Sequence, residues 1–170
     1  MSMQRAFIKA LVLAVFASVV VLAADNQHVI THADLIAPSQ LNSQLAAVKS
    51  GKIVLIHVGF HMMYRMAHIP GSQYAGAASR PDALAELKKL VANLPRNQQI
   101  VIYCGCCPWN NCPNIRPAFE ALKEMGFVNL KALDIPERLG DDWTAKGYPV
   151  VKGEWTDFGL KEREPVCGVS

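Results

Sequence analysis

The sequence lacks several features that would assign it to a familiar functional class. It has no glycine-rich phosphate-binding loop and no Cys-x-x-Cys-His motif, so neither a nucleotide site nor an attached haem is indicated. It has little excess charge, because 17 basic and 14 acidic side chains give a formal net charge of +3. We therefore expect no nucleic-acid partner. Internal repeats and low-complexity tracts are missing as well, which favours one domain.

The N-terminal segment has the pattern of a secretory signal peptide. Arg5 and Lys9 precede an uncharged apolar stretch that ends in small residues before Asp25. This stretch is about 15 residues long, short of the roughly 20 that a membrane-spanning helix needs. We expect residues 1–24 to be a signal peptide and the protein to be exported, most simply to the periplasm. Secretion and a retained membrane anchor are the alternatives, and this segment is the only expected contact with a membrane.

The rest of the chain alternates between buried strands and amphipathic helices. Strands are predicted over 52–58, 100–103 and 128–133, and helices over 40–48, 82–91, 114–125 and 136–146. Such alternation predicts an α/β fold with a mainly parallel sheet that carries helices on both faces. The domain is expected to span residues 25–151, and the tail 152–170 suggests no function.

Four of the five cysteines fall in the segment 104–112, and the fifth is Cys167. The strand over 100–103 brings Cys104 to the carboxyl edge of the sheet, where ligands bind in folds of this class. The helix that begins at Asn114, its predicted N-cap, would direct its positive end at a thiolate there. Cys104 is therefore the predicted nucleophile. Cys112 is the alternative, because it is nearer to the helix start.

Several segments together resemble the rhodanese (sulfurtransferase) domain family. They are the apolar strand that ends in Cys104, the helix entered through Arg116, the motif at 68–72 (His-Ile-Pro-Gly-Ser), and the segments 128–133 and 147–150. The resemblance implies a single rhodanese-like domain with a five-stranded sheet. It also implies a sulfurtransferase or sulfane-sulfur carrier with a persulfide at Cys104. Thiosulfate would be a typical donor, a thiol or cyanide the acceptor, and no cofactor would be needed.

The loop after Cys104 is longer than the family pattern. That pattern has a basic residue about five positions after the cysteine, whereas Arg116 lies twelve positions after Cys104. Arg116 is the candidate for holding the donor's anionic group, since a guanidinium binds sulfonate-like oxygens through paired hydrogen bonds. A solvated charge on the first helical turn is the simpler alternative. Gly105, Trp109 and Asn114 are expected to shape the loop.

The loop contains three further cysteines: Cys106, Cys107 and Cys112. One of them could resolve a persulfide, and Cys104 has Cys-x-x-Cys spacing with Cys107, as in redox-active disulfides. Alternatively, two of them form a structural disulfide that braces the loop, which an oxidising compartment would allow. The second class of function is therefore a non-catalytic rhodanese-like module with a disulfide-braced loop, which has a redox role or binds a metal or a partner.

Two histidines leave a weaker metal alternative open. His57 and His61 follow a central strand at the same sheet edge as Cys104, where zinc or copper could bind them together with cysteines. No spacing matches a familiar zinc module, so the favoured interpretation is no metal. The family's acidic and basic pair after this strand is replaced here by His57 and Gly59, so a changed arrangement of charges is expected.

Overall fold

The computed structural model describes residues 29–153. The predicted signal peptide and most of the tail, including Cys167, lie outside these residues. Five strands form one fully parallel sheet in the order β1-β5-β4-β2-β3. They are β1 (Leu35–Ile36), β2 (Ile53–His57), β3 (Gln73–Tyr74), β4 (Gln99–Tyr103) and β5 (Leu130–Leu133). The predicted α/β class and the five-stranded sheet are confirmed.

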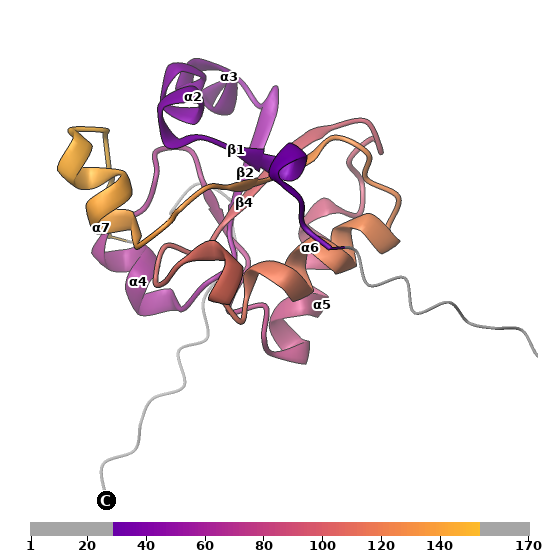
Figure 1. Cartoon of the computed structure of the whole chain (residues 1–170). Coiled ribbons are helices and arrows are strands. Elements are labelled where there is room, and N and C mark those ends of the chain that lie inside the picture. The colour runs from indigo at the N-terminus through magenta and orange to yellow at the C-terminus, as the bar shows by residue number, and fades with distance from the viewer. Residues whose placement is uncertain (1–28, 154–170) are drawn as a thin grey trace, which may run out of the picture.

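Helices lie on both sides of this sheet (Figure 1). The α-helices are α2 (Pro38–Ser43), α3 (Leu45–Lys49), α4 (His61–Met66), α5 (Pro81–Val91), α6 (Ile115–Glu124) and α7 (Leu139–Asp142). Short 3-10 turns are η1 (His32–Asp34), η2 (Trp109–Asn111) and η3 (Thr144–Lys146). None of the described helices is long and apolar enough to cross a membrane.

Two of the predicted helices are each broken into two shorter elements. The helix expected over 40–48 divides into α2 and α3 at Gln44, whose backbone is not helical. The helix expected over 136–146 is observed as two short elements, α7 and η3, which are separated by Trp143. The fully buried Trp143 donates its indole N–H to the carbonyl of Pro149, 2.8 Å away. The backbone leaves helical geometry at Trp143, which periodicity alone does not reveal.

Side chains of β2 and β4 alternate between the two faces of the sheet, as in any pleated strand. On one face they form a core with α5 and α6: Val54, Ile56, Ile100, Ile102, Leu87, Phe119 and Leu122. On the other face they form a core with α2, α3 and α7: Ile53, Leu55, Val101, Tyr103, Leu41, Val48 and Leu139. Both faces of these strands are buried, which explains their continuous apolar sequences.

The parallel register brings the ends of β2 and β4 together. His57 pairs with Tyr103 in the sheet, and the N–H of Val58 donates to the carbonyl of Tyr103 at 2.8 Å. The two segments that leave these strands, beginning at Val58 and at Cys104, therefore start side by side at the carboxyl edge. This edge positions the candidate site.

Candidate active site

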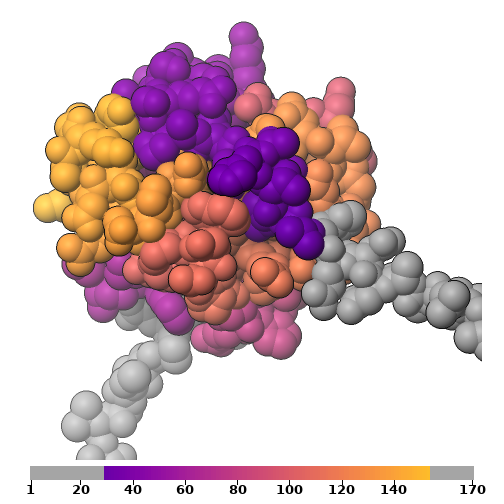
Figure 2. All heavy atoms as spheres, in the orientation of Figure 1, coloured from indigo at the N-terminus to yellow at the C-terminus, as the bar shows by residue number. Residues whose placement is uncertain are grey.

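The loop between β4 and α6 gathers four cysteines at the carboxyl edge of the sheet. The Sγ atoms of Cys104 and Cys106 are 3.1 Å apart, and those of Cys106 and Cys107 are 3.2 Å apart. The sulfurs of Cys104, Cys106 and Cys112 all lie within 4.8 Å of one another. We call these four residues the cysteine cluster. In the space-filling view, the loop is the salmon segment at the surface beside the orange segment that contains α7 (Figure 2).

The disulfide that was one alternative for this loop is absent. All four residues of the cysteine cluster are free thiols. Their closest sulfur–sulfur distance, 3.1 Å, exceeds the roughly 2.05 Å of a disulfide bond. The loop is therefore held by non-covalent contacts between thiols and by backbone hydrogen bonds, and not by a disulfide.

Cys112 lies just before the N-terminus of α6 and is the thiol most readily ionised in its pair with Cys104. A hydrogen bond from the Cys104 thiol lowers the pKa of Cys112 to about 5, and the backbone N–H groups of Asn114 and Ile115 act in the same direction. Burial opposes this shift, since the side chain is only 4% exposed. The start of the helix thus stabilises negative charge on Cys112.

Cys104 follows the last residue of β4 and is more deeply enclosed than the sequence suggested. Its hydrogen bond to Cys112 raises the pKa of Cys104, because the bond needs the thiol proton, and burial raises it further. The residue is 3% exposed, where an accessible and ionised sulfur was expected. It is nevertheless close to the helix start, because the Asn114 side-chain amide donates to its Sγ at 3.4 Å.

Asn114 links the cysteine cluster to the rest of the domain. Asn114 is the N-cap residue of α6, as predicted, but its side chain makes no capping hydrogen bond. Instead, its Oδ1 accepts the backbone N–H of Ser79 at 3.0 Å while its Nδ2 reaches Cys104. The residue is fully buried. Both ends of its amide are hydrogen-bonded, and they connect the segment at Ser79 with the segment at Cys104. This role depends on Ser79, whose proximity cannot be inferred from local sequence.

Gly59 is a site residue that sequence reasoning did not identify as such. An ideal Cβ on Gly59 would lie 2.7 Å from Cys104 Sγ, 2.9 Å from His57 Cε1 and 3.2 Å from the Cys104 carbonyl oxygen. Only a residue without a side chain allows the backbone after β2 to approach this sulfur so closely. The available signal was a glycine directly after a buried strand, which marks close backbone approach.

His57 supports Cys104 rather than offering a free ligand. Its Nδ1 accepts the N–H of Gly59 at 3.3 Å, and its ring also hydrogen-bonds the backbone of Cys104. Burial lowers the pKa of His57 to about 3, so the ring is neutral. His61 is half-buried, with its ring centroid 5.1 Å from that of Tyr74. Among residues 29–153, the group spaced for a metal contains neither histidine.

Backbone hydrogen bonds attach the loop to the first residue of α7 and to the segment before that helix. Gly105 has a φ of 80°, a conformation that favours glycine, and its carbonyl accepts the N–H of Leu139 at 3.0 Å. The N–H of Trp109 donates to the carbonyl of Ile135, also at 3.0 Å. Arg116 is exposed on the first turn of α6 and makes no ion pair within the described part of the chain.

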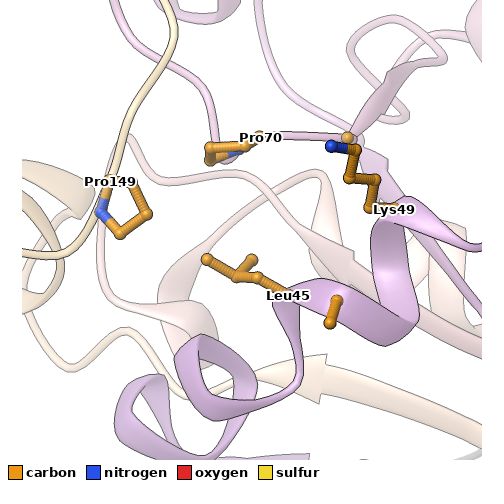
Figure 3. A pocket seen from close by; sticks show the side chains of 6 residues that line it. Leu45, Lys49, Pro70 and Pro149 are labelled. Carbon is orange, nitrogen blue, oxygen red and sulfur yellow. The ribbon is translucent and has the colours of Figure 1, made fainter.

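A pocket of about 460 Å³ lies elsewhere, beside α3 (Figure 3). It is lined by Leu45, Ala46, Lys49, Pro70, Gly71 and Pro149. Its walls are mainly apolar, and it contains no cysteine. It belongs to the face covered by α2 and α3, whereas Cys104 and Cys112 belong to the core formed with α5 and α6. The pocket is therefore not part of the cysteine site.

Comparison with known proteins establishes the family. The model of the rhodanese-like domain matches residues 37–134, more than half of the chain. The protein therefore belongs to the rhodanese-like domain family. The comparison with curated proteins gives no match.

Solved structures agree with this fold. The BH2092 protein from Bacillus halodurans is 18% identical with a TM-score of 0.53, over 69% of this chain and 75% of that one. A thiosulfate sulfurtransferase from Pseudomonas aeruginosa is 21% identical with a TM-score of 0.52, over 71% of this chain but 19% of that one. A persulfide form of EanB with ergothioneine is 22% identical with a TM-score of 0.51, over 69% and 27% of the respective chains. These likenesses show the fold.

Proposed function

We propose that the protein is a sulfane-sulfur transferase or carrier, in which Cys112 accepts the sulfur and Cys104 assists it. The observation that carries this proposal is the pairing of Cys112 with the N–H groups at the start of α6 and with the Cys104 thiol. A thiolate is the nucleophile in sulfur transfer, and here the charge has a defined position. Membership of the rhodanese-like family supports the same chemistry.

The reaction occurs in two balanced transfers. The thiolate attacks the outer sulfur of a donor such as thiosulfate, a new sulfur–sulfur bond forms, and the donor's own sulfur–sulfur bond breaks. Sulfite leaves with the electron pair, and the protein holds a persulfide. An acceptor nucleophile, cyanide or a thiolate, then attacks the outer sulfur of the persulfide and releases the original thiolate. The N–H groups of Asn114 and Ile115 stabilise the anion before and after each transfer.

Cys112 is favoured over Cys104, the nucleophile predicted from sequence, for two reasons. The backbone N–H groups at the helix start lower the pKa of Cys112, whereas the hydrogen bond to Cys112 and burial raise the pKa of Cys104. Arg116 lies four positions after Cys112, close to the family spacing between cysteine and basic residue. The loop and the thiolate of Cys112 are then held in place by Cys104, Gly105, Trp109 and Asn114.

Arg116 supplies the contact proposed for the donor. Its exposed guanidinium on the first turn of α6 can bind the sulfonate group of thiosulfate while the outer sulfur faces Cys112. Cys104 and Cys112 are almost fully buried, whereas Cys106 and Cys107 in the same loop are partly exposed. A donor therefore reaches Cys112 when the loop 105–111 opens. EanB, whose structure contains a persulfide, is a precedent on the same fold.

The alternative is a non-catalytic rhodanese-like module that binds a partner. The burial of Cys104 and Cys112 favours it, because a sealed thiol does not react. The two functions differ in one measurement. In a transferase, the reduced protein gains one sulfur atom from thiosulfate, whereas in a binding module it gains none.

The test is intact mass spectrometry of the reduced full chain after incubation with thiosulfate. We expect one added sulfur in the wild type and none in Cys112→Ser. Cys107→Ser is the matched comparison: it removes only the smallest of the contributions that lower the pKa of Cys112, so it should still accept one sulfur. If Cys112→Ser takes up sulfur and Cys104→Ser does not, the nucleophile is Cys104, as the sequence predicts. No uptake by the wild type from any sulfane donor would favour the binding module.

We also propose that the protein is exported, to the periplasm in the simplest case. The support is the order of basic, apolar and small residues over 1–24. Cell fractionation and N-terminal sequencing of the mature protein test this, with a new N-terminus expected near Asp25. A cytoplasmic protein with an intact Met1 would contradict it.

A further inference from the structure

The cysteine cluster has the composition of a soft-metal site as well as of a sulfur-transfer site. Three of its sulfurs, from Cys104, Cys106 and Cys112, lie mutually within 4.8 Å. Thiolates are soft ligands that select ions such as Cu(I) and Zn(II) over hard cations. Three of them converging on one point are more than a single nucleophile requires.

The dimensions fit a small cation bound by three sulfurs. A metal–thiolate bond of about 2.3 Å places three ligands in a plane about 4 Å apart from one another. The Cys104 and Cys106 sulfurs, now 3.1 Å apart, would separate by about 0.9 Å. Cys106 is only half-buried and belongs to the loop, so it can make this adjustment.

The protein already provides the supporting structure that such a site needs. Cys104 is fixed at the end of β4, and Cys112 lies just before α6, so two ligands come from the ends of regular elements. The Asn114 amide donates to the Cys104 sulfur at 3.4 Å, a contact that orients a ligand. Gly59 closes the other side of that sulfur, which excludes water.

We propose that Cys104, Cys106 and Cys112 form a three-thiolate site for a soft monovalent cation, with Cu(I) as the ion of choice. Cu(I) is stable with three thiolate ligands, whereas structural Zn(II) almost always takes four. Binding replaces thiol protons by the metal and changes no oxidation state. Each ligand that was a thiol releases its proton to solvent.

This inference goes beyond the proposed function, because a bound ion would occupy Cys112 and compete with sulfur uptake. Cys106 separates the two activities. It is a ligand in the metal site, but it is neither the attacking thiolate nor its proton donor. Cys106→Ser should therefore weaken Cu(I) binding, while the first transfer, in which Cys112 takes one sulfur from thiosulfate, still occurs; only the later loss of that sulfur should change.

The experiment titrates the anaerobically reduced full chain with Cu(I) held by a coloured chelator such as bicinchoninate. The wild type should withdraw one Cu(I) per chain at equilibrium. Each of Cys104→Ser, Cys106→Ser and Cys112→Ser should lose at least about tenfold in affinity, as weakening a metal's coordination shell does. Cys107→Ser is the matched control and should bind nearly as the wild type does. A parallel titration with Zn(II) should show weaker binding that depends on Cys107.

Alkylation of the wild type provides a test that needs no variant. Bound Cu(I) should protect Cys104, Cys106 and Cys112 from iodoacetamide, with Cys107 less protected, as peptide mass spectrometry would show. No withdrawal of Cu(I) from the chelator would overturn the proposal. Tighter binding of Zn(II), or an equal loss in Cys107→Ser, would also overturn it, because each implies a four-ligand site. Failed sulfur uptake with intact Cu(I) binding would contradict only the proposed function.

Discussion

Gly59→Ala tests whether the backbone after β2 closes directly on the Cys104 sulfur. The added Cβ would lie 2.7 Å from Sγ, whereas non-bonded atoms prefer about 3.5–4.0 Å. The two atoms must therefore move apart by roughly 1 Å. His57 Cε1 at 2.9 Å and the Cys104 carbonyl at 3.2 Å block movement in other directions. Forcing one extra carbon into such a core costs about 1–3 kcal/mol. We expect this loss in the free energy of unfolding.

Urea denaturation in reducing buffer, followed by circular dichroism, measures this loss. The midpoint should fall while the slope with denaturant stays constant, because the folded and unfolded states keep their exposed surface. Gly140→Ala is the matched control. Its Cβ would meet nothing within 4 Å, and Gly140 lies in the helix α7, where alanine is favoured. That variant should be neutral or slightly stabilised.

The same substitution made in a Cys104→Ala protein tests whether the Cys104 sulfur causes the loss of stability. In Cys104→Ala, the 2.7 Å contact disappears, so adding Gly59→Ala should cost less than it does in the wild type. The difference between the two costs is the coupling between the methyl group and the sulfur. Equal costs in both backgrounds, or a Gly59→Ala protein as stable as the wild type, would refute the close approach.

The remaining predictions concern the thiols and the buried tyrosine. Ultraviolet titration of the reduced protein should show one thiol ionising near pH 5. This step should be lost in Cys112→Ser. In Cys104→Ala it should move to higher pH, because the hydrogen bond between Cys104 and Cys112 is gone. No step below pH 7 would contradict the charge assignment. Cys106→Ser should lengthen the lifetime of a persulfide, measured by mass spectrometry over time, since a neighbouring thiol can displace hydrosulfide from it; an unchanged lifetime would exclude Cys106 as the resolving residue. Tyr103→Phe should cost about 1–3 kcal/mol in urea denaturation, because the hydroxyl accepts the buried N–H of Ile69 at 3.0 Å; a neutral result would mean that this N–H finds another partner.

The central part of the sheet could be predicted because its strands are buried on both faces. The strand expected over 52–58 is β2 at Ile53–His57, and the one expected over 100–103 extends by a single residue. The edge strands β1 and β3 have two residues each, too few for any periodicity to appear. They form because β5 and β2 offer partners, which is a tertiary effect.

The position of the cysteine cluster at the edge of the sheet could be predicted, but the contacts of its residues could not. A cysteine after a buried strand and a helix start soon after indicate the sheet edge from sequence alone. Which sulfur receives the helix N–H groups depends on the path of the loop 105–111. The direction of the Asn114 side chain depends on Ser79, and the tight contact at Cys104 depends on Gly59. Both partners are distant in sequence, and no local pattern encodes them.

In the proposed mechanism, the length of the loop explains why two thiols share one task. In the family pattern, a short loop lets one cysteine stand both at the end of the strand and at the start of the helix. In this chain, the segment 104–112 and its turn η2 separate these two places, and a cysteine occupies each. Accordingly, the pKa of the residue at the strand end is raised and that of the residue at the helix start is lowered. A thiolate stabilised by a neighbouring thiol loses part of that support when the neighbour reacts. We therefore expect oxidation or alkylation confined to Cys104 to slow sulfur uptake at Cys112 without abolishing it, whereas the same change at Cys112 should abolish it.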